Sequence, residues 1–264
     1  YIREEIGLKM LVLSLFCRTR FIKNHKEKAK EDFNTINSYF QKRFRRNTFN
    51  RFIIEYLECK IQYLKEIKNF KEMKKVSKYV LDLTADNVGE KKHAYAHACV
   101  DYADTLSLNG EGKESLKWYE KRMSIQKILL DESDYTILKT AYHNLAIDYI
   151  DFEPENHKKI ILYAKTALDL ADPMKPNYWN TLWGYANALA HIGKYQESYA
   201  YCQKSIEHLK NTDTDEKEYI SDLKLLSAII YSNIDIKKSI PMLENALKKA
   251  FVPSELLSQK RIEK

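Results

Sequence analysis

The chain has 264 residues, of which 44% are hydrophobic and 31% are charged, so it carries enough apolar side chains to bury a core. Only 6 Gly and 5 Pro occur over this length, which argues against a β-sandwich or an α/β enzyme and favours an all-helical protein. The net charge of +7 is uneven, because residues 1–82 carry a surplus of positive charge and the remainder a small surplus of negative charge.

The start of the chain contains an apolar run, "MLVLSLFC" at residues 10–17, which is far too short to span a bilayer. Basic residues flank it and no small-residue cleavage site is evident, so we expect neither a membrane contact nor an export signal. The four cysteines lie far apart within helical patterns, and we expect reduced core thiols in a cytoplasmic protein. Because the sequence opens on Tyr1 in mid-helix, we expect it to continue upstream, with room for a further domain.

The densest charge cluster lies at residues 41–52, "QKRFRRNTFNRF". Its basic residues are Lys42, Arg43, Arg45, Arg46 and Arg51, and they are interleaved with Phe44, Phe49 and Phe52. Basic and aromatic side chains together can bind nucleic acid, or the charges can dock an acidic protein partner. The plainest alternative is a solvated connection whose Phe residues fill the core. All three interpretations stay open, with nucleic acid less favoured than a protein partner.

A pattern with a period near forty recurs five times along the chain. Each copy places a small or apolar residue just inside a helix, at Met73, Ser115, Ile160, Ser198 and Ser239. The preceding helix carries big, big, small and big residues on one face, a spacing that favours packing against a neighbour. Examples are Cys99, Tyr102, Ala103 and Leu106; Leu182, Tyr185, Ala186 and Leu189; and Leu223, Leu226, Ser227 and Ile230. The pattern therefore predicts helical hairpins built to stack.

These hairpins, and the motif "GKYQES" at residues 193–198, resemble the tetratricopeptide repeat family. The long period is similar to that of kinesin light chains and of bacterial receptors for signalling peptides. The resemblance implies an all-α, right-handed superhelix of about five to six hairpins that binds a peptide in a concave groove and relays this to an attached effector domain. We expect a degenerate, basic N-terminal hairpin at residues 1–50, the repeats at 51–250, and a C-terminal tail or cap at 251–264.

In this family the first helix of each hairpin lines the groove, so its positions off the packing face are candidate binding residues. The peptide-binding candidates are Asp101, Asp104, His143, Asn144, Asn180, Trp183, Asn187, His191 and Tyr231. The same projection places Glu55, Glu58 and His97 on the early, acidic part of the face. Asn can pair with an extended backbone, and aromatic residues can supply apolar contacts. The alternative is a merely polar, solvated face.

For catalysis the sequence offers little. The glycine-bearing stretch "NGEGKES" lacks the spacing and the preceding strand of a phosphate loop. His93 and His97 stand one helical turn apart, a spacing that can bind zinc, but Cys99 falls on the packing face and no third ligand can be placed. We therefore expect no metal, no cofactor and no enzymatic activity.

Overall fold

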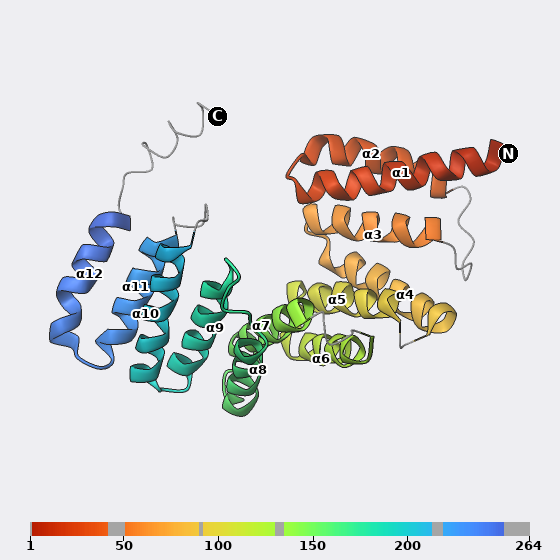
Figure 1. The fold of residues 1–264 in the computed structure, drawn as a ribbon. Coiled ribbons are helices and arrows are strands. Elements are labelled where there is room, and N and C mark those ends of the chain that lie inside the picture. Colours follow the sequence, from red (N-terminus) through yellow and green to blue (C-terminus); the bar gives the residue numbers. More distant parts are fainter. Residues whose placement is uncertain (1, 42–50, 90–91, 130–134, 213–218, 251–264) are drawn as a thin grey trace. The chain divides into compact units, whose positions relative to one another are not determined.

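The computed structural model describes the whole chain except residues 1, 42–50, 90–91, 130–134, 213–218 and 251–264. Within this described part, twelve α-helices form and no strand does (Figure 1). The helices are α1 (Ile2–Ile22), α2 (Lys26–Gln41), α3 (Arg51–Glu66), α4 (Phe70–Val88), α5 (His93–Leu108), α6 (Gly112–Leu129), α7 (Tyr135–Phe152), α8 (His157–Asp169), α9 (Tyr178–His191), α10 (Tyr195–Asn211), α11 (Tyr219–Ser232) and α12 (Ile236–Ala250). The all-helical prediction is confirmed.

The chain divides into two compact units, Tyr1–Asp131 and Glu132–Lys264. In the first unit, α1 packs on α2, α3 on α4 and α5 on α6, and in the second α7 packs on α8, α9 on α10 and α11 on α12. Neighbouring hairpins of one unit also contact each other, for example through α4 and α5 or through α10 and α11. The described helices therefore form six hairpins, in agreement with the predicted five to six.

Local sequence explains where several helices begin and end. The side chains of Asn69 and Asn156 cap α4 and α8, because each accepts a hydrogen bond from a backbone N–H in the first turn of its helix. After α9 the chain turns at Gly193, whose φ of +81° lies in the left-handed region that glycine adopts without steric cost. These caps and this turn place the hairpin boundaries where the repeat pattern predicts them.

The small and apolar residues that start each second helix are all buried, as the repeat pattern predicts. Met73, Ser115, Ile160, Ser198 and Ser239 are at most 2% exposed. The hydroxyl of Ser198 donates to the carbonyl oxygen of Ala186 at 2.7 Å, across the α9–α10 hairpin. A serine at this position lets the two helices approach closely and still satisfies its own hydroxyl group.

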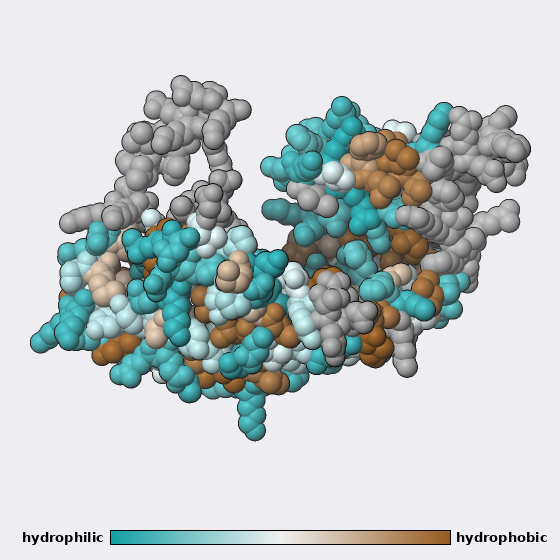
Figure 2. Space-filling model, in the orientation of Figure 1, coloured by the Kyte–Doolittle hydropathy of each residue, from teal (hydrophilic) through white to brown (hydrophobic). Residues whose placement is uncertain are grey.

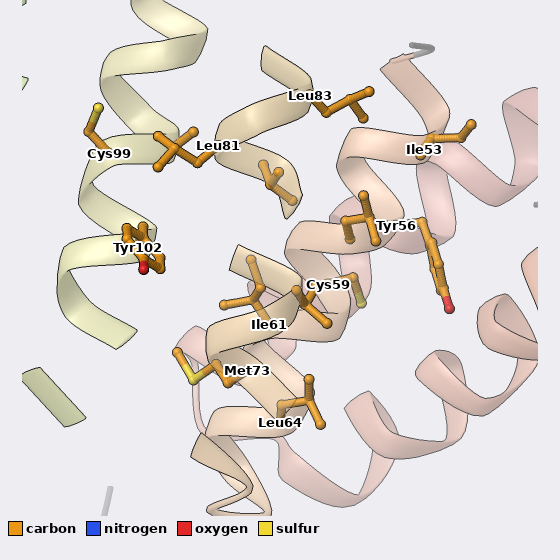
Figure 3. Close-up of a cluster of buried hydrophobic side chains, with 14 of the residues drawn as sticks. Ile53, Tyr56, Cys59, Ile61, Leu64, Met73, Leu81, Leu83, Cys99 and Tyr102 are labelled. Carbon is orange, nitrogen blue, oxygen red and sulfur yellow. The ribbon is translucent and has the colours of Figure 1, made fainter. Parts of the chain in front are cut away.

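The core of the first unit is a continuous cluster between consecutive hairpins. Figure 3 shows side chains of α3, α4 and α5 meeting in it, with Ile61, Leu81 and Cys99 among them. All four cysteines are buried and take part in no disulfide, and the Sγ atoms of Cys17 and Cys59 lie 2.8 Å apart. The prediction that the cysteines are core thiols is confirmed.

Two leucines near the end of the described repeats are exposed, and one of them, Leu226, was expected on the packing face. Leu226 of α11 is 37% exposed and Leu247 of α12 is 42% exposed, whereas Leu182 and Leu189 of α9 are buried as predicted. The reason for Leu247 is that α12 packs chiefly on α11 and has no further described helix against its other side. Leu226 borders a cavity that residues of α9 and α11 line.

The apolar run at residues 10–17 lies within α1. Cys17 and Ser14 are buried, whereas Val12, Leu15 and Phe16 are 42–54% exposed. Figure 2 shows hydrophobic residues gathered over α1 on the face in view. None of the described helices combines the length and the apolar character needed to traverse a bilayer.

Candidate functional site

The first helices of the hairpins carry the candidate residues. We call their outward side chains the first-helix face of each unit: α1, α3 and α5 in the first unit, and α7, α9 and α11 in the second.

The first-helix face of the first unit is an ionic network that joins three successive hairpins. Arg18 of α1 lies 2.9 Å from Glu55 of α3 and also contacts Oε2 of Glu58. The Nδ1 atom of His97 on α5 lies 3.8 Å from Oε1 of Glu58 and 3.4 Å from Oδ2 of Asp101. The network thus brings together residues that are far apart in the sequence.

The carboxylates of this network are largely shielded from solvent. The side chains of Glu55, Glu58 and Asp101 are 14–16% exposed, whereas that of His97 is 56% exposed. Burial raises the pKa of Glu58 although Arg18 opposes this effect. The hydrogen bond to Asp101 raises the pKa of His97. The network therefore favours the protonated, positively charged form of His97, its exposed member.

Asp104, one turn beyond Asp101, is engaged with its own hairpin partner. Its carboxylate accepts a hydrogen bond from the hydroxyl of Tyr119 on α6. Burial raises the pKa of Asp104, and burial also lowers the pKa of the nearby Arg122. Arg122 stands seven residues after Ser115, where the other second helices carry Val80, Ala167, Ser205 and Ala246, so a charged side chain replaces a small one here.

The first-helix face of the second unit is apolar and aromatic by comparison. A cavity of about 460 Å³ opens between α9 and α11, and we call it the α9–α11 pocket. Its lining consists of Trp179, Asn180, Trp183, Tyr219, Asp222, Leu223 and Leu226. The rings of Trp179 and Tyr219 stack with centroids 5.5 Å apart. Because Tyr219 is 43% and Leu226 is 37% exposed, the pocket presents apolar surface to solvent.

His143 of α7 packs against α9 and is only partly exposed. Its imidazole lies beside Gly184, where an added Cβ atom would sit 2.4 Å from Cε1 of the ring. Burial lowers the pKa of His143, and Lys139 adds to this effect. Asn144, the next residue, is exposed on α7. Of this predicted pair, His143 therefore serves helix packing and Asn144 faces solvent.

The remaining candidates of the second unit do not line the α9–α11 pocket. His191 donates from Nε2 to the carbonyl oxygen of Pro154 at 2.8 Å, which ties the end of α9 to the α7–α8 turn. The ring of Tyr231 packs against the ring of Tyr199 on α10, with the two ring centroids 4.7 Å apart. Asn187 is partly exposed on α9. Of the predicted set, only Asn180 and Trp183 meet in the pocket.

Several residues of these sites were missed at the level of sequence. Trp179 and Tyr219 were not among the candidates, and Leu226 was assigned to the packing face. The pair Trp179 and Trp183, four residues apart on one helix, is a signal that could have marked the pocket. No comparable local signal links His97 to Glu58, because the two residues lie on different hairpins.

The predicted basic cluster is largely outside the described residues. This holds for Lys42, Arg43, Arg45 and Arg46. Arg51 opens α3, but its side chain is not described. The cluster therefore stays a prediction.

No protein-family model matches the sequence, and no curated protein sequence matches it either. Solved structures do match the fold. A protein described as a kinesin light chain of Podosopora anserina, with nearly identical TPR-like repeats, has 14% identity and a TM-score of 0.64, over 74% of this chain and 93% of that one. The apo form of RapI has 15% identity and a TM-score of 0.66, over 92% of this chain and 64% of RapI.

A third similar structure is a Rap protein complexed with Competence and Sporulation Factor, with 11% identity and a TM-score of 0.53. It matches over 92% of this chain and 77% of the Rap protein. Sequence identities this low show a shared fold and nothing further. The chain therefore has the fold of tetratricopeptide repeat proteins, with repeats like those of kinesin light chains and Rap proteins, as the repeat pattern predicts.

Proposed function

We propose that the chain is a non-catalytic, regulatory binding module that holds an extended peptide or protein segment on the first-helix face of its second unit. The observation that carries this proposal is the α9–α11 pocket, in which Trp183 and the partly exposed Leu226 present apolar surface. Exposed apolar surface in a concave site favours a ligand that removes it from water. The bound segment would place an apolar side chain in the pocket.

Polar groups at the edge of the pocket suit a peptide backbone. Asn180 is exposed there, and its amide can both donate and accept hydrogen bonds. Asp222 adds a carboxylate that can accept from backbone or side-chain N–H groups. An apolar pocket with a few polar groups beside it is the usual composition of a specific binding site.

The similar structures support a ligand of this kind, because one of them is a Rap protein in complex with Competence and Sporulation Factor. We further propose that binding is relayed to an effector domain attached to the module. Docking of nucleic acid or an acidic protein at the basic cluster remains the alternative. The experiment must therefore separate the pocket from that cluster.

The test is selection of a displayed library of random peptides against the full chain, followed by affinity measurements with one selected peptide. We expect Trp183→Ala to weaken binding by ~2 kcal/mol or more, roughly thirtyfold in dissociation constant, because a partly buried tryptophan is a typical hot spot. Leu226→Ser should weaken it less, since it removes a smaller apolar contact. Fluorescence anisotropy of the labelled peptide gives both affinities.

The matched control is Leu162→Ser, which makes the same change at a 58% exposed leucine of α8, a second helix. This control should bind like the parent. If the two pocket variants bind like the parent and Arg46→Ala alone loses the ligand, the basic cluster is the binding site and the proposal is wrong.

A further inference from the structure

We propose that Glu58, His97 and Asp101 form a binding site for one divalent transition-metal ion of the zinc type on the first-helix face of the first unit. One ligand atom from each of the three side chains lies within 4.8 Å of the other two. This site is separate from the α9–α11 pocket and does not depend on the proposed function.

Helix geometry explains why two of the ligands meet. His97 and Asp101 are four residues apart on α5, so their side chains project from one face on successive turns. The Nδ1 atom of His97 and Oδ2 of Asp101 are 3.4 Å apart, which is close to the roughly 3.3 Å between donor atoms of a tetrahedral zinc site. Such a pair on a helix needs a third ligand from elsewhere in the fold.

The stacking of hairpins supplies that third ligand from α3. Oε1 of Glu58 lies 3.8 Å from Nδ1 of His97, so small side-chain rotations bring all three atoms to coordination distance. The other oxygen of Glu58, Oε2, contacts Arg18, which holds the carboxylate with Oε1 toward the histidine. Hydrogen-bonded partners of this kind commonly orient metal ligands.

The local charge is suited to a dication. The carboxylates of Glu55 and Glu58 contact the guanidinium of Arg18, and the carboxylate of Asp101 lies against His97, so the network holds three negative charges and one positive charge. With His97 neutral, the surplus of two negative charges equals the charge that a divalent ion brings. An imidazole with two carboxylates suits zinc and related ions better than Mg²⁺, which prefers oxygen ligands and retains its waters.

The site has one open side. The side chain of His97 is 56% exposed, whereas those of Glu58 and Asp101 are 14% and 16% exposed. Three protein ligands with solvent beside them leave the fourth position of the ion for a water molecule. His93, which stands one helical turn before His97, is exposed and is not part of this group.

The test is titration of the full chain with Zn²⁺ by isothermal calorimetry, with Co²⁺ as a spectroscopic probe and Mg²⁺ as the comparison ion. We expect one high-affinity Zn²⁺ per chain, a visible absorption band with Co²⁺, and no comparable binding of Mg²⁺. Glu58→Gln, Asp101→Asn and His97→Ala should each abolish the high-affinity event, and circular dichroism shows whether each variant is folded.

His93→Ala is the matched control, because it removes an imidazole from the same helix, and it should keep the high-affinity event. Zn²⁺ should also raise the melting temperature of the parent and of His93→Ala but not that of the three ligand variants. If Zn²⁺ binding survives Glu58→Gln and Asp101→Asn but is lost in both histidine variants, the ion uses the histidine pair and the proposal is overturned. Binding that is unchanged in all variants, or absent in the parent, also overturns it.

Discussion

The two units use the same hairpin architecture but present different chemistry on their first-helix faces. In the first unit, Arg18, Glu58 and His97 belong to an ionic network across α1, α3 and α5. In the second, Trp183 and Leu226 line an apolar pocket between α9 and α11. The positions that build the core recur in both units, whereas the outward positions are free to differ. The fold therefore positions a binding surface, and the outward side chains decide what that surface can bind.

The largest expected effect concerns the part that the two units share. Leu106 of α5 and Leu189 of α9 occupy the same place in the repeat and are 0% and 1% exposed. We expect Leu106→Ala and Leu189→Ala each to lower the free energy of unfolding by about 2–5 kcal/mol, because each leaves a cavity in a packed core. Chemical denaturation followed by circular dichroism measures both.

Leu162→Ala serves as the control, because the side chain that it shortens is exposed on α8 and should contribute little to stability. If either core variant lowers the free energy of unfolding by no more than this control does, the two units do not share the same core packing. The comparison between them is then wrong.

A smaller effect is expected where α7 and α9 of the second unit meet. Gly184→Ala places a methyl group 2.4 Å from Cε1 of His143, so the imidazole must move. We expect this overpacking to lower the free energy of unfolding by about 1–3 kcal/mol. Thermal and chemical denaturation of the variant measure the loss.

The double variant Gly184→Ala with His143→Ala tests the cause. Removing the imidazole should recover part of the loss, so the two changes together should cost less than the sum of their separate effects. Additive costs would show that Gly184 is required for a reason other than the approach of His143.

The smallest effect distinguishes the two faces by their histidines. In the metal-free protein, the pKa of His97 is raised by Asp101 and that of His143 is lowered by burial, so they should titrate on opposite sides of the ordinary value of 6.5. Proton NMR of the imidazole resonances, assigned with His97→Ala and His143→Ala, measures both. If the pKa values of both histidines lie on the same side of 6.5, the predicted difference between the two faces is wrong.

The same shifts give opposite signs for stability. Because its folded pKa is lowered, His143 contributes stability that is present above pH 6.5 and is lost as the pH falls toward the folded pKa. Because its folded pKa is raised, His97 contributes stability below pH 6.5 that is lost as the pH rises through the folded pKa. His143→Ala should therefore reduce the loss of stability on acidification.

The sequence by itself determined the helices, the hairpins and most of the packing positions. Small and large residues recur at helical spacing, and this periodicity is local, so positions such as Ser115, Ser198 and Leu189 could be placed in the core from the pattern alone. The sequence also predicted an acidic early part of the first-helix face and a later part with amide, imidazole and aromatic side chains. Both features depend only on which side of a single helix each residue occupies.

Only the tertiary structure decided which outward residues meet. Glu58 and His97 come from different hairpins, and the distance between them depends on how those hairpins stack, which helical spacing does not encode. For the same reason, Leu226 fits the packing pattern of its own helix but borders a pocket with Trp183, because two successive first helices leave a gap between them there. Helical periodicity identifies the outward face of a helix, but the meeting of residues from separate helices is fixed by packing.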